Sequence, residues 1–343
     1  MRLFIVGESP GEEEALQGTP FVGRSGQLLM KVLKEFDIAR EDCYITNVFK
    51  MRPPDNNVDF FFMRKGESKK IGWDKKCPHP LFGTHGYVKE EYLEHLNELR
   101  GEIKNETPRT ILALGATSLW ALTGHDTIGS YRGTRCPCRL FSGPIIIPAY
   151  HPAAILRNWE SLPLLYNDVS KALHTADSPP DRKIIIRPTI EDLWNFYNDH
   201  ILQAKREEIP VTFDIETADD QITCIGFSVG NIAIVVPFYA SNTKYHSYWK
   251  TFDEEVEAWN FVKAVIEDPS LIKVGHNASY DIQWLAAKFK IFIQGRLEDT
   301  MFMAHSLQPE MRKGLGVLAS QMCDAPAWKQ MVKHQSSENK KDA

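Results

Sequence analysis

The sequence GESPGEEEALQGTPFVGRSGQLL, residues 7–29, joins two apolar segments of different periodicity. The run before it, RLFIV at residues 2–6, is typical of a buried strand. Glycine and proline then break the run, three glutamates follow, and apolar residues recur at helical spacing between residues 28 and 36. We therefore expect a strand, a loop rich in glycine and carboxylate, and a helix. Open α/β sheets bind ligands at such strand ends. Taken alone, however, the pattern is more simply explained as a solvent-exposed connecting loop.

The composition is typical of a folded protein, and basic residues outnumber acidic ones only locally, not over the whole chain. The chain has 343 residues, 43% of them hydrophobic, which leaves room for one to three domains. Its net charge of −5 excludes a general basic attraction to nucleic acid. A basic patch lies between residues 50 and 76, a stretch with eight basic and four acidic residues. This patch is equally compatible with a DNA contact and with a solvated loop.

Neither a membrane segment nor a disulfide framework is indicated. No apolar run approaches the ~20 residues that a membrane-spanning helix needs, and the N-terminus enters a strand without the basic region of a signal peptide. The six cysteines are scattered and form no C-x-x-C pair. We expect thiols in a reducing compartment, and hence a soluble protein with no membrane partner.

Strands alternate with helices over the first half of the chain, and this predicts a parallel sheet covered by helices on both faces. Residues 55–86 interrupt the alternation with many glycine, proline and lysine residues and no periodicity, so we predict a long loop there. The expected strands are residues 2–6, 44–49, 110–114 and 144–148, and the expected helices are residues 28–36, 90–103, 115–122 and 162–173.

Four short motifs stand near the strand ends of this half. They are GESPG with Glu8, PFVG with Phe21, TNV with Asn47, and YHPAAIL with His151. In this order they resemble the family-four uracil-DNA glycosylases over about residues 1–175. The resemblance implies a three-layer αβα sandwich around a central four-stranded parallel sheet. It also implies excision of uracil from DNA by hydrolysis of the N-glycosidic bond.

The residue types in these motifs suit that chemistry. Uracil has to be flipped into a pocket before its bond to the sugar is cut. Phe21 would stack on the ring, and Asn47 would pair with its Watson–Crick edge because an amide both donates and accepts. His151 would stabilise the charge that develops on the leaving base, and by resemblance Glu8 would position water and oppose the sugar cation. The alternatives are a core phenylalanine, a turn asparagine and a hydrogen-bonded core histidine.

The same motifs supply the residues expected to contact DNA. Ile155 or Leu156 would wedge into the base stack at the place that the flipped base has left. The other expected DNA contacts in this half are Gly7, Pro10, Gly11, Gly23, Ser25, Lys50, Arg52 and Pro152.

The chain departs from that family at the iron–sulfur cluster, which four cysteines usually hold. Two of these cysteines precede the first strand in the family, and a third stands where this chain has Met51. Only Cys77 corresponds to the fourth, and one thiol cannot hold a cluster. We therefore expect no iron–sulfur cluster.

A stretch rich in proline and aspartate, residues 176–182, is predicted to be a linker, and the pattern changes after it. Three of the strands that follow are expected to form a meander. The expected strands are residues 183–186, 211–215, 223–229, 232–238 and 272–275, and the expected helices are residues 190–201, 252–267, 281–289 and 299–307.

Three carboxylates in this second half form a further constellation. Asp214 and Glu216 share one face of a strand because side chains alternate with period two, and Asp281 opens a later helix within NASYD. The pattern resembles the proofreading 3′–5′ exonuclease domain of A-family DNA polymerases, which has a ribonuclease H-like mixed sheet. The resemblance implies that these three acids hold Mg²⁺ or Mn²⁺. It also implies that Asn277 and Tyr280 contact the DNA end.

Such exonucleases carry a fourth carboxylate as Tyr-x-x-x-Asp or His-x-x-x-x-Asp, and we expect it to be missing. No tyrosine follows Tyr280, and neither His305 nor His334 has an aspartate five residues later. His276 does have Asp281 at that distance, but Asp281 is already the third carboxylate. We therefore expect weak nuclease activity from residues 183–343.

Together these features predict a DNA repair and replication protein that joins a uracil-DNA glycosylase (residues 1–175) to an exonuclease-like domain (residues 183–343). Joined domains of this kind resemble the N-terminal part of a phage-type DNA polymerase. The implied partners are uracil-containing DNA, single-stranded 3′ ends and a polymerase polypeptide, in the cytoplasm of a bacterium or a phage-infected cell. The alternative is a non-catalytic DNA-binding or polymerase-tethering fragment in which both folds survive as scaffolds.

Overall fold

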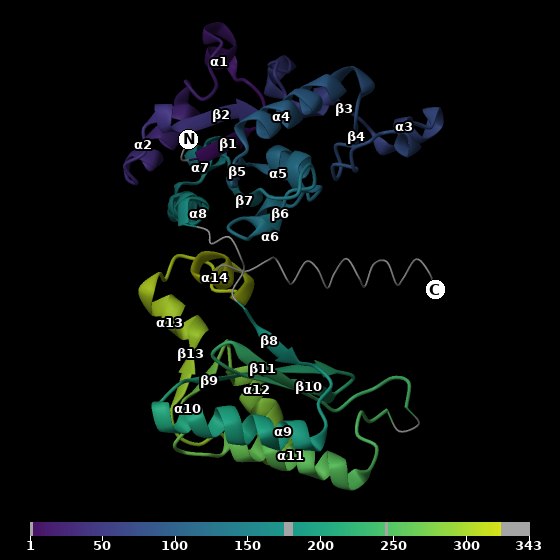
Figure 1. Ribbon diagram of the computed structural model, residues 1–343, viewed down its shortest axis with the longest axis vertical. Helices are drawn as coiled ribbons and strands as arrows, with labels where there is room; N and C mark the ends of the chain where they lie inside the picture. Colours follow the sequence, from purple (N-terminus) through teal and green to yellow (C-terminus); the bar gives the residue numbers. More distant parts are fainter. Residues whose placement is uncertain (1–2, 175–180, 244–245, 324–343) are drawn as a thin grey trace. The chain divides into compact units, whose positions relative to one another are not determined.

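The computed structural model describes residues 3–174, 181–243 and 246–323 (Figure 1). They fall into two compact units, of which the first holds residues 3–174 with residues 316–323 and the second holds residues 181–315. The sequence had assigned everything after residue 183 to one domain, whereas residues 316–323 pack with the first unit. The predicted linker, residues 176–182, lies outside the described residues except for its last two.

The first unit is built on a sheet of five strands in the order β2-β1-β5-β7-β6. The four strands β2, β1, β5 and β7 are parallel, which confirms the predicted sheet. The short β6 adds an antiparallel edge that the sequence did not indicate. The strands are β1 (Leu3–Gly7), β2 (Cys43–Asn47), β5 (Thr110–Leu114), β6 (Cys136–Pro137) and β7 (Ile145–Ala149).

Helices cover both faces of this sheet because its strands are apolar on both sides. In β1, Phe4 and Val6 belong to one buried cluster, and Leu3 and Ile5 belong to another. The first cluster takes in residues of α4 (Leu93–Glu106) and α5 (Ala116–Thr123). The second takes in residues of α2 (Arg24–Lys34), α7 (Pro152–Arg157) and α8 (Leu162–His174). The result is the predicted three-layer αβα sandwich.

The prediction of a long loop at residues 55–86 was wrong. The segment forms short helical turns and a small antiparallel pair of strands, β3 and β4. Its aromatic side chains enter the core: the Phe61 ring stacks on Phe49 with centroids 3.8 Å apart, and Phe82 stacks on Trp120 at 5.3 Å. The aromatic residues are clustered rather than periodic, so they gave no strand or helix signal. The elements here are η2 (Pro54–Asn56), η3 (Val58–Phe61), β3 (Phe62–Met63), α3 (Lys65–Ile71), η4 (Trp73–Lys75) and β4 (Tyr87–Val88).

The remaining elements of the first unit are short helices around the sheet. They are α1 (Glu12–Gln17), η1 (Arg40–Asp42), η5 (Glu90–Tyr92), α6 (Ile128–Tyr131), η6 (Trp159–Ser161) and α14 (Leu315–Met322).

The second unit is a mixed sheet of six strands in the order β13-β12-β9-β10-β11-β8. Strands β9, β10 and β11 form the predicted antiparallel meander, and β8, β12 and β13 each run parallel to their neighbours. This mixed α/β arrangement fits the predicted ribonuclease H-like domain. The strands are β8 (Lys183–Ile185), β9 (Val211–Ala218), β10 (Gln221–Val229), β11 (Ile232–Pro237), β12 (Lys273–Gly275) and β13 (Leu297–Asp299).

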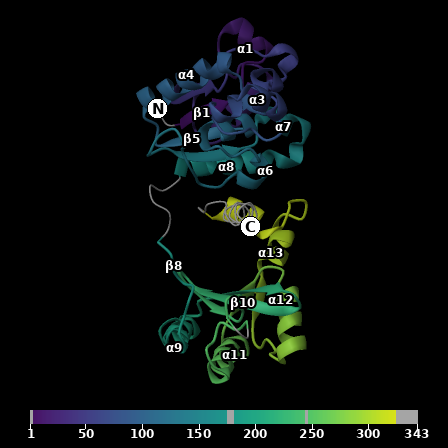
Figure 2. The same ribbon diagram turned by 90° about the vertical axis from the view of Figure 1, so that its right-hand side faces the viewer.

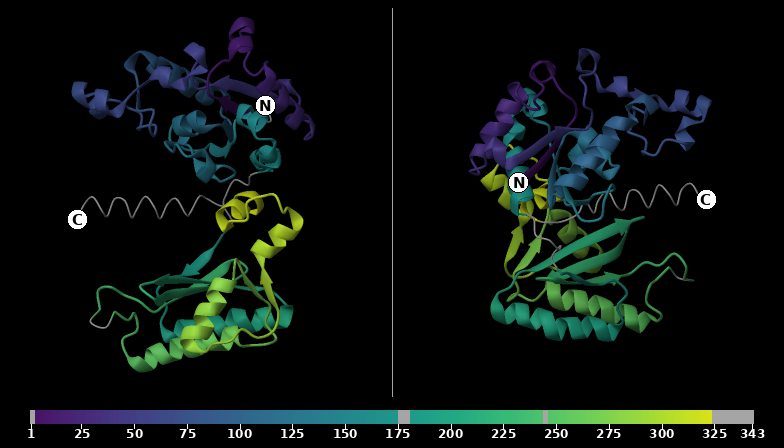
Figure 3. Two further views of the ribbon diagram at one scale, coloured as in Figure 1. Left: turned by 180° about the vertical axis from the view of Figure 1, so that it is seen from behind. Right: turned by 45° about the horizontal axis from the view of Figure 1, so that its top comes forward.

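One face of this second sheet is covered by α9 and α11, which lie side by side in Figures 2 and 3. Their apolar residues join those of β9 and β10 in a single buried cluster. Because side chains alternate along β9, the opposite side carries its polar residues. The helices are α9 (Ile190–Phe196), η7 (Tyr197–Ile201), α10 (Leu202–Glu207), α11 (Phe252–Ile266), α12 (Ser279–Trp284), η8 (Leu285–Phe289) and α13 (Thr300–Leu307).

Two general predictions can be compared with the described residues. All six cysteines are thiols rather than disulfides, as predicted. Among the described residues, no helix is both long enough and apolar enough to cross a membrane.

Candidate functional site

A cavity of about 550 Å³ opens at the carboxyl ends of the parallel strands of the first unit. Four residues that the sequence singled out, Glu8, Phe21, Asn47 and His151, all line it. They come from four separate stretches of the chain, and the sheet brings them together because parallel strands end at the same edge. The other lining residues are Ser9, Pro10, Gly11, Glu14, Ser25, Asn56, Gly115, Ala116, Ile128, Tyr150, Ala153, Ala154 and Arg157.

Phe21 occupies the cavity because two glycines leave it room. A Cβ atom on Gly7 would lie 2.6 Å from Cζ of the Phe21 ring, and one on Gly26 would lie 2.0 Å from the Phe21 carbonyl oxygen. Phe21 itself adopts a left-handed backbone conformation with φ of 56°. Such a conformation is uncommon for a bulky residue and marks a constrained position. The ring centroid of Phe21 lies 5.6 Å from that of His151.

Asn47 is placed by the register of the sheet. It is the last residue of β2 and pairs with Gly7 at the end of β1. A Cβ atom on Gly7 would lie 2.4 Å from the amide oxygen of Asn47, so the missing side chain makes room for this amide as well. The backbone N–H groups of Val48 and Phe49 continue the ladder by donating to the Gly7 and Glu8 carbonyls. The Asn47 side chain is therefore buried and held at a fixed position in the cavity wall.

His151 caps the N-terminus of α7 with its ring. Its Nδ1 atom accepts the N–H of Ala153 at 3.2 Å, so the neutral ring carries its hydrogen on Nε2. Burial, and then the positive charge of Arg157, lowers the pKa of His151 to about 4. The histidine is consequently a neutral hydrogen-bond donor near pH 7 rather than a cation.

Glu8 follows β1 directly, and its carboxylate is held by a neighbouring helix. Thr117, in the first turn of α5, donates its hydroxyl to Oε2 of Glu8. This bond fixes the direction of the carboxylate at the cavity wall.

Sequence reasoning missed several residues of this cavity. Tyr150 is the first residue of the YHPAAIL motif and Arg157 directly follows it, so both could have been included among the site residues. Asn56 comes from the segment that was predicted to be a loop, and Thr117 acts only through Glu8. No local pattern signals either of these two, because their roles depend on the tertiary fold.

The predicted DNA-contacting residues of this half fall into three groups. Four of them, Gly7, Pro10, Gly11 and Ser25, lie at the cavity of about 550 Å³ or against its Phe21 ring. Gly23 and Leu156 line a second hollow of about 590 Å³, together with Ser25. Pro152 is buried in the first turn of α7.

The two candidate wedge residues and the two basic residues have different surroundings. Ile155 is buried in the core, whereas Leu156 is only partly buried. Lys50 forms an ion pair with Glu102 at 2.7 Å and also donates to Thr46. Arg52 donates to Asn56 at the cavity. Of the two wedge candidates, only Leu156 has an accessible side chain.

In the second unit, two of the three predicted metal ligands lie on one face of β9. Asp214 and Glu216 are exposed, and they alternate with the buried Phe213 and Ile215. Asp281, from α12, is buried and accepts the N–H of Ile215 at 2.8 Å. Burial raises the pKa of the Asp281 carboxyl.

The loop before α12 is held by a residue that the sequence did not single out. Asn277 has a left-handed φ of 60°, and its N–H donates to Oδ1 of Asp299 at 3.0 Å. The N–H of Ala278 donates to the other oxygen of Asp299 at 2.8 Å. Tyr280 shares a hydrogen bond of 2.7 Å with Thr217 on β9.

The residues present do not form a metal site as they stand. Within residues 3–174, 181–243 and 246–323, no group of three or more His, Cys, Asp or Glu side chains is arranged to hold an ion. Asp281 in particular directs an oxygen to a backbone N–H. An iron–sulfur cluster does not fit either: Met51 is not a thiolate, and the Cys77 thiol points to the Val88 carbonyl.

Comparison with known proteins identifies both halves of the chain. The sequence profile of the uracil DNA glycosylase superfamily matches residues 1–174. The chain belongs to the uracil DNA glycosylase superfamily. A second profile, described as 3′–5′ exonuclease, matches residues 186–343. The two matches, in this order, confirm the fusion that the motifs predicted.

The most informative relatives match one half or both. The type-4 uracil-DNA glycosylase of Thermotoga maritima is 35% identical over 173 residues, which is 50% of this chain and 76% of the relative. That of Saccharolobus solfataricus is 30% identical and covers 52% of this chain and 73% of the relative. The DNA polymerase of Bacillus phage SP01 is 22% identical over 334 residues, 88% of this chain. The chain spans only 32% of the length of that polymerase.

The lowered pKa of His151 predicts how the stability of the folded protein depends on pH. The pKa in the folded protein, about 4, lies below the ordinary value of 6.5, so between these values the unfolded chain binds more protons than the folded one. The stability due to a neutral His151 is therefore present above about pH 6.5 and is lost as the pH falls toward 4. We expect the free energy of unfolding to drop more between pH 7 and pH 5 in the wild type than in His151→Gln, as measured by urea denaturation.

His79, whose pKa burial also lowers to about 4, is present in both proteins, so its contribution cancels in this comparison. An equal loss of stability in the two proteins would show that His151 is not held neutral.

Proposed function

We propose that the first unit excises uracil from DNA by hydrolysing the bond between the base and its sugar. The observation that carries this proposal is the convergence of Phe21, Asn47, His151 and Glu8 in one cavity. The superfamily assignment and the type-4 relatives support it. They also favour it over the alternative of a non-catalytic scaffold.

The base reaches the cavity by leaving the DNA stack, since the target bond is inaccessible inside a duplex. The ring of Phe21, fixed against Gly7, offers the flat face on which a flipped uracil stacks. The Asn47 amide accepts the N3–H of uracil and donates to its O4 oxygen, which cytosine cannot match with its amino group. The rigid position of Asn47 at the end of β2 supports this role, because selectivity needs a fixed donor and acceptor.

The histidine and the glutamate act on the two charges that separate as the bond breaks. The electron pair of the C1′–N1 bond leaves with the base, and negative charge spreads to its O2 oxygen. The neutral His151 donates its Nε2 hydrogen to that oxygen and needs no proton transfer to do so. Glu8, oriented by Thr117, stabilises the cationic sugar and accepts a proton from the water that attacks C1′. This chemistry requires no metal and no iron–sulfur cluster.

The remaining predicted contacts are assigned to the DNA backbone and the vacated stack. Leu156 is our candidate for the wedge, since its side chain lines the hollow beside the cavity. Gly7, Pro10, Gly11, Gly23, Ser25 and Pro152 would approach the sugar-phosphate chain around the flipped nucleotide. Arg52 would contact the same sugar-phosphate chain near Asn56. Lys50 contributes less than the sequence implied, because Glu102 already neutralises its charge.

We further propose that the second unit retains single-stranded 3′ ends but trims them slowly. The exonuclease profile supports DNA-end binding, with Asn277 and Tyr280 as contacts. Asp214, Glu216 and Asp281 would attract Mg²⁺ or Mn²⁺ only loosely, because one carboxylate oxygen of Asp281 is already bonded to the N–H of Ile215. The phage polymerase relative supports a polymerase polypeptide as partner, and a bacterial or phage-infected cytoplasm as the place of action.

Removing the histidine tests the glycosylase proposal. His151→Ala should slow uracil release by a factor of about 10² or more, because the negative charge on the leaving base loses its hydrogen-bond donor. Asn47→Asp should weaken the preference for uracil over other bases. The assay uses end-labelled single-stranded DNA with one uracil, in EDTA, followed by alkali. His174→Ala, an exposed histidine at the end of α8, should leave the rate unchanged. Wild-type protein that leaves uracil-DNA intact after long incubation would defeat the proposal.

The nuclease proposal predicts slow, metal-dependent trimming. In magnesium or manganese, the wild type should shorten single-stranded DNA slowly from its 3′ end, and Asp214→Ala should abolish the residual trimming. Asp253→Ala, which removes an acid in the first turn of α11, serves as the control. Rapid 3′–5′ degradation by this 343-residue chain, lost in Asp214→Ala, would mean that a further acid completes the ligand set.

A further inference from the structure

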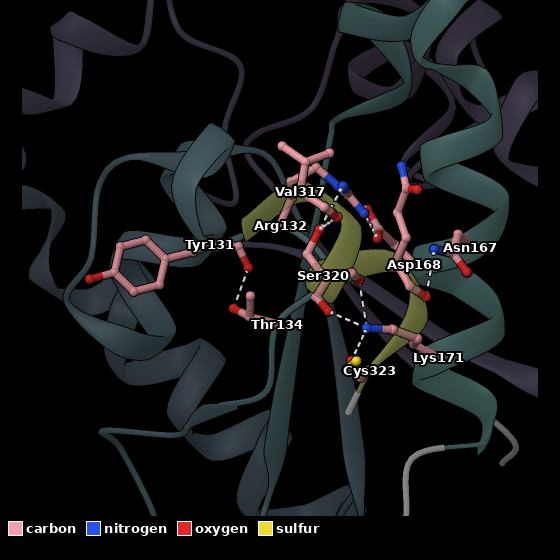
Figure 4. Close-up of polar contacts among 11 residues, drawn as sticks. Tyr131, Arg132, Thr134, Asn167, Asp168, Lys171, Val317, Ser320 and Cys323 are labelled. Atoms are coloured by element: carbon pink, nitrogen blue, oxygen red, sulfur yellow. Dashed lines mark hydrogen bonds and ion pairs between the residues drawn. The ribbon is translucent and has the colours of Figure 1, made fainter. Parts of the chain in front are cut away.

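The helix α14 packs on the glycosylase unit although about 140 residues separate it from α8 in the sequence (Figure 4). Its residues Ala319 and Ser320 are buried there. The partners come from α8 and from the loop that follows α6, and Figure 4 shows their polar groups directed at the end of α14. Neither the superfamily profile, which ends at residue 174, nor the motifs account for this contact.

The last turn of α14 is bound through its backbone carbonyls. Lys171 donates to the carbonyl oxygens of Ser320 and Cys323, each at 2.5 Å, and also to that of Gly133 at 2.9 Å. Asn167 donates its side-chain amide to the carbonyl of Gln321 at 3.1 Å. The final carbonyls of a helix have no partners within the helix, and a cation is favourable at that end. The surface of α8 therefore recognises a helix C-terminus.

A buried ion pair completes the contact. Arg132 donates from Nε to Oδ2 of Asp168 at 3.0 Å and from Nη2 to Oδ1, and both residues are almost fully buried. The third donor of Arg132, Nη1, donates to the Ser320 hydroxyl at 3.1 Å, and that hydroxyl donates to the Val317 carbonyl at 2.7 Å. A buried ion pair needs its remaining donors satisfied. Ser320 supplies that partner.

Gly133 shows that the surface is shaped for the helix. Its φ is 65°, and a Cβ atom would lie 2.6 Å from Oδ1 of Asp168 and 2.7 Å from the Ser320 carbonyl oxygen. Any other residue would be strained there and would displace α14.

We propose that this surface is a docking site for the chain's own α14, and that docking supports the glycosylase cavity. The N–H of Gly133 donates to the carbonyl of Pro148 in β7 at 2.7 Å, and β7 leads directly into Tyr150 and His151. Ile128, in the helix before this loop, lines the cavity.

The docking itself is independent of what the cavity does, whereas its effect on uracil release rests on the proposed function. Amide hydrogen exchange of the full chain separates the two. In Ala319→Glu, a charge and extra volume enter the buried site, and we expect exchange at residues 316–323 and 131–134 to rise at least tenfold. Exchange at residues 145–151 should also rise, but by less, and exchange in the meander of the second unit should stay unchanged. Met322→Ala, on the exposed side of the same helix, is the matched control.

A second variant keeps the test decisive if Ala319→Glu fails to fold. Lys171→Met removes the donor to the helix end and should raise exchange at residues 316–323 and slow uracil release several-fold. If residues 316–323 already exchange freely in the wild type, there is no docking. If exchange in the variants rises at residues 316–323 but not at residues 131–134 and 145–151, docking does not support the cavity. If the variants raise exchange as expected but no protein, including the wild type, releases uracil, the result contradicts the proposed function alone.

Discussion

The absence of a side chain on Gly7 is the constraint on which the candidate site depends. Gly7 ends the first strand, and the Phe21 ring and the Asn47 amide both occupy the space that its Cβ atom would fill. The backbone of Phe21 also lies so close to Gly26 that a Cβ atom there would collide with the Phe21 carbonyl. A flat aromatic surface and a directional amide are thereby held next to each other at the edge of a rigid parallel sheet. Both groups need that rigidity, because base selection depends on small differences in position.

Burial of His151, more than the charge of Arg157, determines the protonation state of this ring in the cavity. His151 could carry a proton on either nitrogen, but the N–H of Ala153 occupies Nδ1, and burial keeps the ring neutral. A neutral donor suits a base that leaves with negative charge, since it stabilises the charge without first having to be protonated. Glu8, which follows β1, lines the same cavity and has its own hydroxyl partner. The carboxylate and the neutral donor can therefore act on the two charges that separate as the bond breaks.

Periodicity and strand-end motifs in the sequence were sufficient to predict the sheet of the first unit and the four residues that meet in its cavity. They could not predict features that depend on tertiary contacts. The aromatic residues Phe61 and Phe82 belong to a segment without period, yet they fill the core. The sequence suggests that Lys50 contacts DNA, but its charge is neutralised by Glu102, which lies 52 residues away in the chain. The docking of α14 on Arg132 and Lys171 joins parts of the chain that no local pattern connects.

The most direct test of this account is a crystal structure of the protein with free uracil, which is the released base. The account predicts that the uracil ring stacks on Phe21, with its N3–H and O4 bonded to the Asn47 amide and its O2 facing Nε2 of His151. Uracil found outside the cavity at saturating concentration would contradict it. So would uracil in the cavity with its Watson–Crick edge turned away from Asn47.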